Sequence, residues 1–228
     1  MTTTAASLLR LTLSLSDRYP IAAGVTFLVV AALALMGIGR HHPFGRMGIA
    51  NLVTGARGML TALVAAALME VPSEDVAWAL VALAIAALVL DGFDGWAARR
   101  QSVVSAFGAR FDMEVDAFLI LALAALVWRF DKAGAWVLAS GLMRYVFVAV
   151  GLVWPWFDRE LPASRRRQLV CVVQIAGLIA ALAPIVPQPL SAWVAGLSLA
   201  ALAWSFWVDV QWLVLRRRSD LGLVTSDL

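Results

Sequence analysis

The chain has 228 residues, of which 62% are hydrophobic and only 14% are charged, and its formal net charge is +3. A soluble globular domain usually carries about 25% charged residues. The composition therefore excludes an ordinary soluble domain and predicts an all-α polytopic membrane protein. The single cysteine, Cys171, excludes an intrachain disulfide.

Seven apolar segments are long enough to be membrane helices, because a helix needs about 20 apolar residues to cross the hydrocarbon. The connections between them contain prolines or charged residues, and proline cannot continue a helix. The predicted spans are residues 20–38, 48–70, 76–98, 105–128, 133–154, 167–184 and 190–214.

The N-terminal residues 1–19 are short and partly amphipathic. Two structures are compatible with this segment: a helix on the membrane surface, or a poorly ordered tail. No small-x-small cleavage site follows the apolar run at 20–38, so we expect an uncleaved helix there rather than a signal peptide.

The basic residues of the predicted connections are distributed unequally between the two membrane faces. The face opposite the N-terminus holds eleven of them, against four on the other face, and the positive-inside rule makes the richer face cytoplasmic. The eleven are Arg40, Arg46, Arg99, Arg100, Arg159, Arg165, Arg166, Arg167, Arg216, Arg217 and Arg218.

Four aspartates lie near the cytoplasmic ends of two neighbouring spans. Asp91 and Asp94 are three residues apart, and Asp112 and Asp116 are four apart, so each pair lies on one face of its helix. A short turn near 99–104 makes the two helices antiparallel neighbours. The four carboxylates are therefore expected to converge just below the cytoplasmic surface.

Such a cluster predicts a site for divalent cations. Four close carboxylates cannot all stay ionised unaided, and hard oxygen ligands suit Mg²⁺, Mn²⁺ or Ca²⁺. Two metal ions sharing these ligands can hold a diphosphate during group transfer. Gly95 and Gly108 leave room for a ligand to approach the backbone, and Arg99 is placed to meet phosphate oxygens.

The stretch DGFDGWAARRQSVVSAFGARFDMEVD fits the pattern Asp-x₂-Asp-Gly-x₂-Ala-Arg-x₈-Gly-x₃-Asp-x₃-Asp. This pattern resembles the signature of the CDP-alcohol phosphotransferase (phosphatidyltransferase) family. The matching positions are Asp91, Asp94, Gly95, Ala98, Arg99, Gly108, Asp112 and Asp116.

The resemblance implies a six-helix membrane core, here residues 48–215, whose second and third helices carry the signature. Residues 1–47 are then an added surface segment with an extra transmembrane helix, and 216–228 form a cytoplasmic tail. The family makes phospholipids or their precursors, and its members are expected to form homodimers. The preference for arginine over lysine suggests a GC-rich bacterial genome, so we expect the inner membrane, with the site facing the cytoplasm.

By resemblance, two Mg²⁺ or Mn²⁺ ions are implied. Asp91, Asp94 and Asp112 would hold one of them, and Asp91, Asp112 and Asp116 the other. Asp116 would also be the general base for an alcohol hydroxyl that attacks the β-phosphorus of CDP-diacylglycerol and releases CMP.

The same resemblance assigns the donor-binding residues. Gly95 would give room to the cytidine, Arg99 would hold the diphosphate, and Ser105 would lie near the nucleotide. The stretch NLVTGAR, residues 51–57, resembles the opening of the family core. It implies donor contacts for Asn51 and Thr54 and a neutralising role for Arg57, and Ala98 and Gly108 complete the substrate-binding set.

The sequence does not determine the identity of the acceptor alcohol. Ala117 stands where several subfamilies have a basic residue, and the chain has one lysine. Arg144 either binds an anionic acceptor or pairs with an acid inside the bundle, and Arg166 is a second candidate for such an acceptor. Two structural pairings are also expected: Arg110 with Glu114 by i, i+4 spacing, and Asp209 with an arginine.

Two other functions are compatible with a buried acid cluster. The first is a cation transporter or channel, but that would place acids near the membrane midplane beside broken helices. The second is a catalytically silent relative that scaffolds other enzymes, which nothing in the filled motif favours. We therefore expect a transferase.

Overall fold

The computed structural model describes the chain except residues 37–48, 102–105, 155, 158–160, 163 and 221–228. For residues 33–36, 49–52, 54, 93–101, 106–112 and 218–220 only the backbone is described. The secondary-structure elements of the described residues are all helices: α1 Thr2–Leu13, α2 Tyr19–Met36, α3 Ile49–Ala66, η1 Ala67–Met69, α4 Glu74–Gln101, α5 Ala106–Arg129, η2 Ala135–Leu138, α6 Ala139–Val153, α7 Arg165–Leu182 and α8 Leu190–Asp220.

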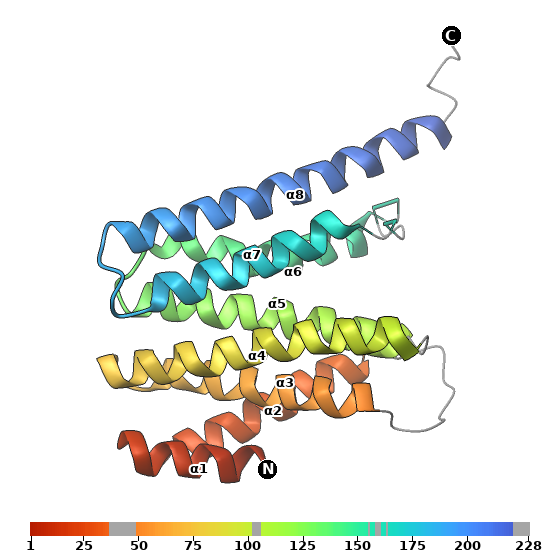
Figure 1. Ribbon diagram of the computed structural model, residues 1–228. Coiled ribbons are helices and arrows are strands. Elements are labelled where there is room, and N and C mark those ends of the chain that lie inside the picture. The colour runs from red at the N-terminus through yellow and green to blue at the C-terminus, as the bar shows by residue number, and fades with distance from the viewer. Residues whose placement is uncertain (37–48, 102–105, 155, 158–160, 163, 221–228) are drawn as a thin grey trace.

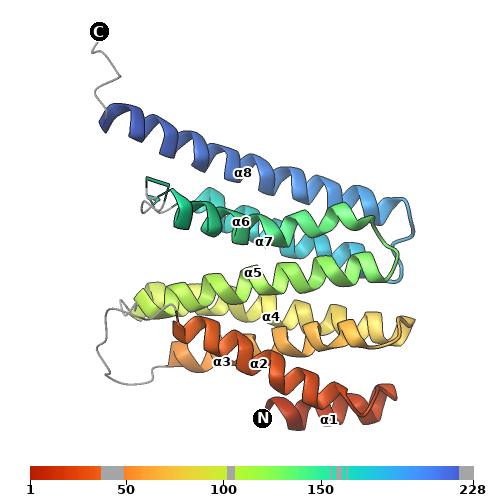
Figure 2. The same ribbon diagram turned by 180° about the vertical axis from the view of Figure 1, so that it is seen from behind.

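The helices lie side by side as a bundle with two distinct ends (Figure 1). One end holds the junctions between α4 and α5 and between α6 and α7, together with the C-terminus of α8. The other holds the connections from α3 to α4, from α5 to α6 and from α7 to α8. The same order is seen from behind (Figure 2). The end that carries the α4–α5 junction is the end predicted to face the cytoplasm.

Three stretches of the described chain are long and apolar enough to cross a membrane: Glu74–Gly92, Ala135–Val153 and Leu190–Arg217. Two shorter apolar stretches, Tyr19–Ala32 and Gly55–Met69, accompany them. The all-helical class is confirmed, whereas the division into a six-helix core and one added span stays a prediction.

Helix α1 does not project from the bundle but packs against α2 and α3. The chain entering α2 is fastened to the end of α3 by polar contacts. The backbone N–H and hydroxyl of Ser16 donate to the two carboxylate oxygens of Glu70, at 2.9 and 2.6 Å. The Tyr19 hydroxyl donates to the carbonyl of Leu63 at 2.9 Å. The N-terminal hairpin is therefore joined to the helix that opens the predicted core.

Two glycines allow close contact between helices of the C-terminal half. A Cβ atom at Gly141 would lie 2.4 Å from the Cα of Leu121, so α6 approaches the backbone of α5 there. A Cβ at Gly177 would lie 2.7 Å from the Cβ of Ser198, where α7 meets α8. Small residues at helix contacts strengthen van der Waals packing, on which helix association in membranes depends.

Lys132 joins two connections at the end of the bundle opposite the α4–α5 junction. Its ammonium group donates to the carbonyls of Val186 at 2.8 Å, Ala183 at 3.2 Å and Pro184 at 3.5 Å, just beyond α7. The Ser191 hydroxyl donates to the Lys132 carbonyl at 2.6 Å. The only lysine of the chain thus donates hydrogen bonds to three carbonyl groups just beyond the end of α7, which accept no hydrogen bond within a helix.

Replacing Lys132 by methionine should lower the free energy of unfolding by about 2 kcal/mol, because hydrogen bonds to a charged group are lost while the carbonyls stay in place. Thermal unfolding in detergent micelles measures the effect. Arg165→Met, at the exposed first residue of α7, is the matched control and should change stability little. Equal effects of the two substitutions would contradict the role assigned to Lys132.

Candidate active site

Arg57 on α3 joins two of the four aspartates that the sequence singles out. Its Nη1 lies 2.9 Å from Oδ1 of Asp91 on α4. Its Nη2 donates to Oδ1 of Asp116 on α5. The Arg57 side chain is only 1% exposed, whereas those of Asp91 and Asp116 are 23% and 18% exposed. A buried guanidinium therefore faces two carboxylates that retain a partly open side.

For Asp91 and Asp116, this arrangement confirms the prediction that carboxylates from the two motif helices converge. Helix α3 packs against both α4 and α5, which brings Arg57 between them. The predicted neutralising cation is thereby found in contact with the acids. Since an unpaired charge inside a membrane protein costs several kcal/mol, these contacts also hold the three helices together.

The second oxygen of Asp116 has a partner that the sequence did not reveal. The thiol of Cys171 on α7 lies 3.8 Å from Asp116 Oδ2, within the range of a weak S–H hydrogen bond. From the sequence, Cys171 predicted only that no intrachain disulfide forms, and no motif surrounds it. Helix α7 thus reaches the site as well, in agreement with its packing against α4 and α5.

The other motif residues are located by their helices alone. Asn51 and Thr54 lie on α3, and Asp94, Gly95, Ala98 and Arg99 lie on α4 one to two turns beyond Asp91. Gly108 and Asp112 lie on α5, ahead of Asp116. The side chains of these residues, and Ser105 altogether, fall outside the described part of the structure. Their predicted contacts remain predictions.

The donor set at Asp91 and Asp116 fits a hard divalent cation, because both residues offer carboxylate oxygens that meet at one point and stay partly exposed. Among the residues that the structure describes, no group of three or more His, Cys, Asp or Glu side chains is close enough to hold a metal ion. A complete site would need Asp94 and Asp112, which lie outside that set.

A second ion pair lies on another face of α5. Arg144 on α6 donates through Nη2 to Oε1 of Glu114, and both side chains are about one-third exposed. Of the two readings of Arg144, pairing with an acid inside the bundle is confirmed. Glu114 was expected to pair with Arg110 of its own helix; its described partner is Arg144, and the side chain of Arg110 lies outside the described residues. Interhelical packing, rather than i, i+4 spacing, supplies this contact.

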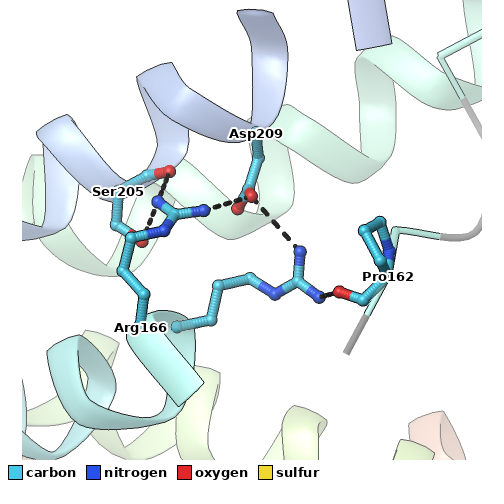
Figure 3. Close-up of polar contacts among 5 residues, drawn as sticks. Pro162, Arg166, Ser205 and Asp209 are labelled. Carbon is cyan, nitrogen blue, oxygen red and sulfur yellow. Dashed lines mark hydrogen bonds and ion pairs between the residues drawn. The ribbon is translucent and has the colours of Figure 1, made fainter. Parts of the chain in front are cut away.

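A third ionic cluster joins the start of α7 to α8 (Figure 3). Nη1 of Arg166 donates to the carbonyl and hydroxyl oxygens of Ser205, the latter at 2.8 Å, and its Nη2 donates to Asp209. Arg167 donates to the same Asp209 oxygen at 3.2 Å and to the carbonyl of Pro162. The predicted pairing of Asp209 with arginine is confirmed, and Arg166 is held by three oxygens of α8.

A family model for CDP-alcohol phosphatidyltransferase matches residues 47–208. This range contains the contacts of Arg57 and of Arg144, and it ends one residue before Asp209 of the third cluster. The chain belongs to this family. Neither the curated proteins nor the solved structures gave a match. The family indicates transfer of a phosphatidyl group from a CDP-alcohol, and with the apolar helices it indicates an integral membrane enzyme. Helices α1 and α2 both precede the matched region.

Asp209→Asn should lower the free energy of unfolding by about 2 kcal/mol, because Arg166 and Arg167 would lose the charged acceptor that they share. Chemical or thermal unfolding in micelles measures the loss. Asp17→Asn is the matched control: Asp17 pairs with Arg10 and is 85% exposed, and an exposed pair contributes at most about 1 kcal/mol. A larger loss for Asp17→Asn than for Asp209→Asn would contradict this assignment.

Proposed function

We propose that this protein transfers the phosphatidyl group of CDP-diacylglycerol to the hydroxyl of a small alcohol and releases CMP. The observation that carries the proposal is the meeting of Asp91 and Asp116 at Arg57, within the region that the family model matches. Two separate helices thereby contribute carboxylates to one polar centre inside an apolar bundle. Intramembrane acids of this kind mark functional sites by default.

In the proposed reaction Asp116 is the general base. It takes the proton from the acceptor alcohol, whose oxygen attacks the β-phosphorus while the bond from that phosphorus to the CMP oxygen breaks. CMP leaves with the electron pair of the broken bond. Asp116 is suited to this role because its carboxylate is partly exposed, whereas its position is fixed by Arg57 and Cys171.

Asp91, Asp94, Asp112 and Asp116 are the residues that would hold two Mg²⁺ or Mn²⁺ ions. When bound, these ions would supply the positive charge that stabilises the donor diphosphate during transfer. Asn51, Thr54, Gly95, Ala98, Arg99, Ser105 and Gly108 are proposed to bind the donor.

For the acceptor we propose an anionic alcohol, with Arg144 and Arg166 as its binding residues. Both arginines already have carboxylate partners, Glu114 and Asp209. An anionic group would therefore share or displace these partners. Charge-assisted contacts from arginine to phosphate or carboxylate are strong enough for such an exchange.

We further propose a homodimer in a bacterial inner membrane, with the active site facing the cytoplasm. The orientation is supported by the position of the α4–α5 junction, which lies at the same end of the bundle as Arg216 and Arg217 near the C-terminus of α8 (Figure 1). Basic residues favour the cytoplasmic side.

The purified protein should release CMP from CDP-diacylglycerol when Mg²⁺ or Mn²⁺ and a suitable alcohol are present. Asp116→Asn should lower the rate by about 10²–10⁴-fold, the usual contribution of a general base, and Asp91→Asn should require more metal. Asp75→Asn is the matched control, because Asp75 lies exposed at the opposite end of α4 from Asp91.

Full activity of Asp116→Asn would exclude Asp116 as the base. No CMP release by the wild-type protein with any alcohol of a broad acceptor panel would contradict the transferase function. Metal-ion uptake by sealed vesicles would then favour the transporter alternative.

Once an anionic acceptor has been found, Arg144→Gln should raise its KM about tenfold and leave the KM of CDP-diacylglycerol unchanged. Glu114→Gln is the matched control, since it breaks the same ion pair but keeps the cation. Steady-state kinetics with both substrates varied separates the two variants. An equal rise of the acceptor KM in both would show that the ion pair, rather than the cation of Arg144, matters.

A further inference from the structure

The acid cluster has its own organic cation, built into α3. Arg57 is almost completely buried, and it contacts one oxygen of Asp91 and one of Asp116. Its guanidinium is planar, permanently charged and forked, so two of its nitrogens reach carboxylates on two different helices. Among these three groups the formal charge is +1 − 2 = −1, and without Arg57 it would be −2.

We propose that Arg57 is the resident counter-cation of this site: it keeps α3, α4 and α5 assembled when no divalent ion is bound, and it opposes the binding of that ion. The proposal rests on the proposed metal-dependent function. It makes Arg57 a positioning residue that acts through Asp91 and Asp116, in addition to the donor and acceptor residues named above.

The first part of the proposal follows from the cost of close carboxylates in an apolar bundle. Asp91 and Asp116 repel each other, and burial raises the cost of their charges. A mobile ion would relieve this only while it is bound, whereas Arg57 is always present. The helices can therefore fold and insert before any metal ion is acquired.

The second part follows from the same charges. A guanidinium that neutralises a carboxylate lowers the negative potential that attracts a divalent ion. A positive charge within about 4–6 Å lowers the affinity of a carboxylate for a proton by about tenfold or more, and the repulsion between Arg57 and a divalent ion acts in the same direction. Arg57 thus weakens metal binding while it stabilises the metal-free state, and the two effects have one origin.

The experiment compares wild-type protein with Arg57→Gln in nanodiscs of phosphatidylcholine, a zwitterionic lipid without net charge, and without nucleotide or acceptor. Thermal unfolding is measured in EDTA and in Mn²⁺, and Mn²⁺ binding is measured by electron paramagnetic resonance of the free ion. We expect Arg57→Gln to melt at lower temperature in EDTA, to be stabilised more by Mn²⁺, and to bind Mn²⁺ about tenfold more tightly.

Arg129→Gln is the matched control. Arg129 donates to the carbonyl of Glu70 at 2.9 Å and lies at the end of α5 away from Asp116. Its loss should lower the melting temperature equally with and without Mn²⁺ and leave Mn²⁺ affinity unchanged.

Unchanged or weaker Mn²⁺ binding by Arg57→Gln would overturn the proposal, because Arg57 would then support metal binding or act as packing alone. If Arg57→Gln cannot be recovered folded, Arg57→Gln combined with Asp91→Asn decides the question. In the double variant the three positions 57, 91 and 116 again have a formal charge of −1, so this variant should fold in EDTA. If it fails to fold, Arg57 is needed for the shape of its side chain rather than for its charge, and the proposal is wrong.

These readouts are independent of the proposed reaction. Tighter Mn²⁺ binding by Arg57→Gln, in a protein whose wild type releases no CMP, would support the counter-cation and reject the transferase. CMP release by the wild type, together with unchanged Mn²⁺ binding in Arg57→Gln, would support the transferase and reject the counter-cation.

Discussion

A guanidinium buried between two carboxylates is the interaction on which the arrangement of this bundle depends. Apolar side chains alone do not determine which membrane helices become neighbours, because lipid chains are as apolar as leucine. Arg57, Asp91 and Asp116 do so, because each would be costly to leave unpaired in the membrane. Their contacts bring α3, α4 and α5 to one point, and α7 joins them through Cys171. The chemistry of the site and the packing of its helices thus have the same cause.

Helix α5 separates two ionic centres by its own geometry. Asp116 and Glu114 are two residues apart, so they lie on different faces of the helix. Asp116 turns to Arg57 on α3, and Glu114 turns to Arg144 on α6. The proposed donor site and the proposed acceptor site therefore lie at similar depth on two different sides of one helix.

The sequence predicted the helices well and their polar contacts only in part. Apolar runs bounded by proline and charge located α5 and α7 to within about two residues of 105–128 and 167–184, because the length of a span is set by the membrane. Spacing also predicted that Asp91 and Asp116 converge. Spacing along α5 was insufficient to predict the partner of Glu114. That partner, Arg144, belongs to the neighbouring helix α6, and the sequence alone does not show which face of α6 packs against α5. Cys171 was missed for the same reason: its contact with Asp116 is purely tertiary.

The added N-terminal hairpin has a physical role that follows from what it touches. Tyr19 binds the carbonyl of Leu63, six residues after Arg57 on the same helix, and Ser16 binds Glu70 just beyond the end of η1. These contacts brace α3 at its end away from the acids, along a side that faces α1 and α2. A helix that carries a buried cation toward two anions must resist rotation, because turning it would move the guanidinium away from at least one of them. The hairpin contributes no motif residue, yet by bracing α3 it supports the geometry on which the motif depends.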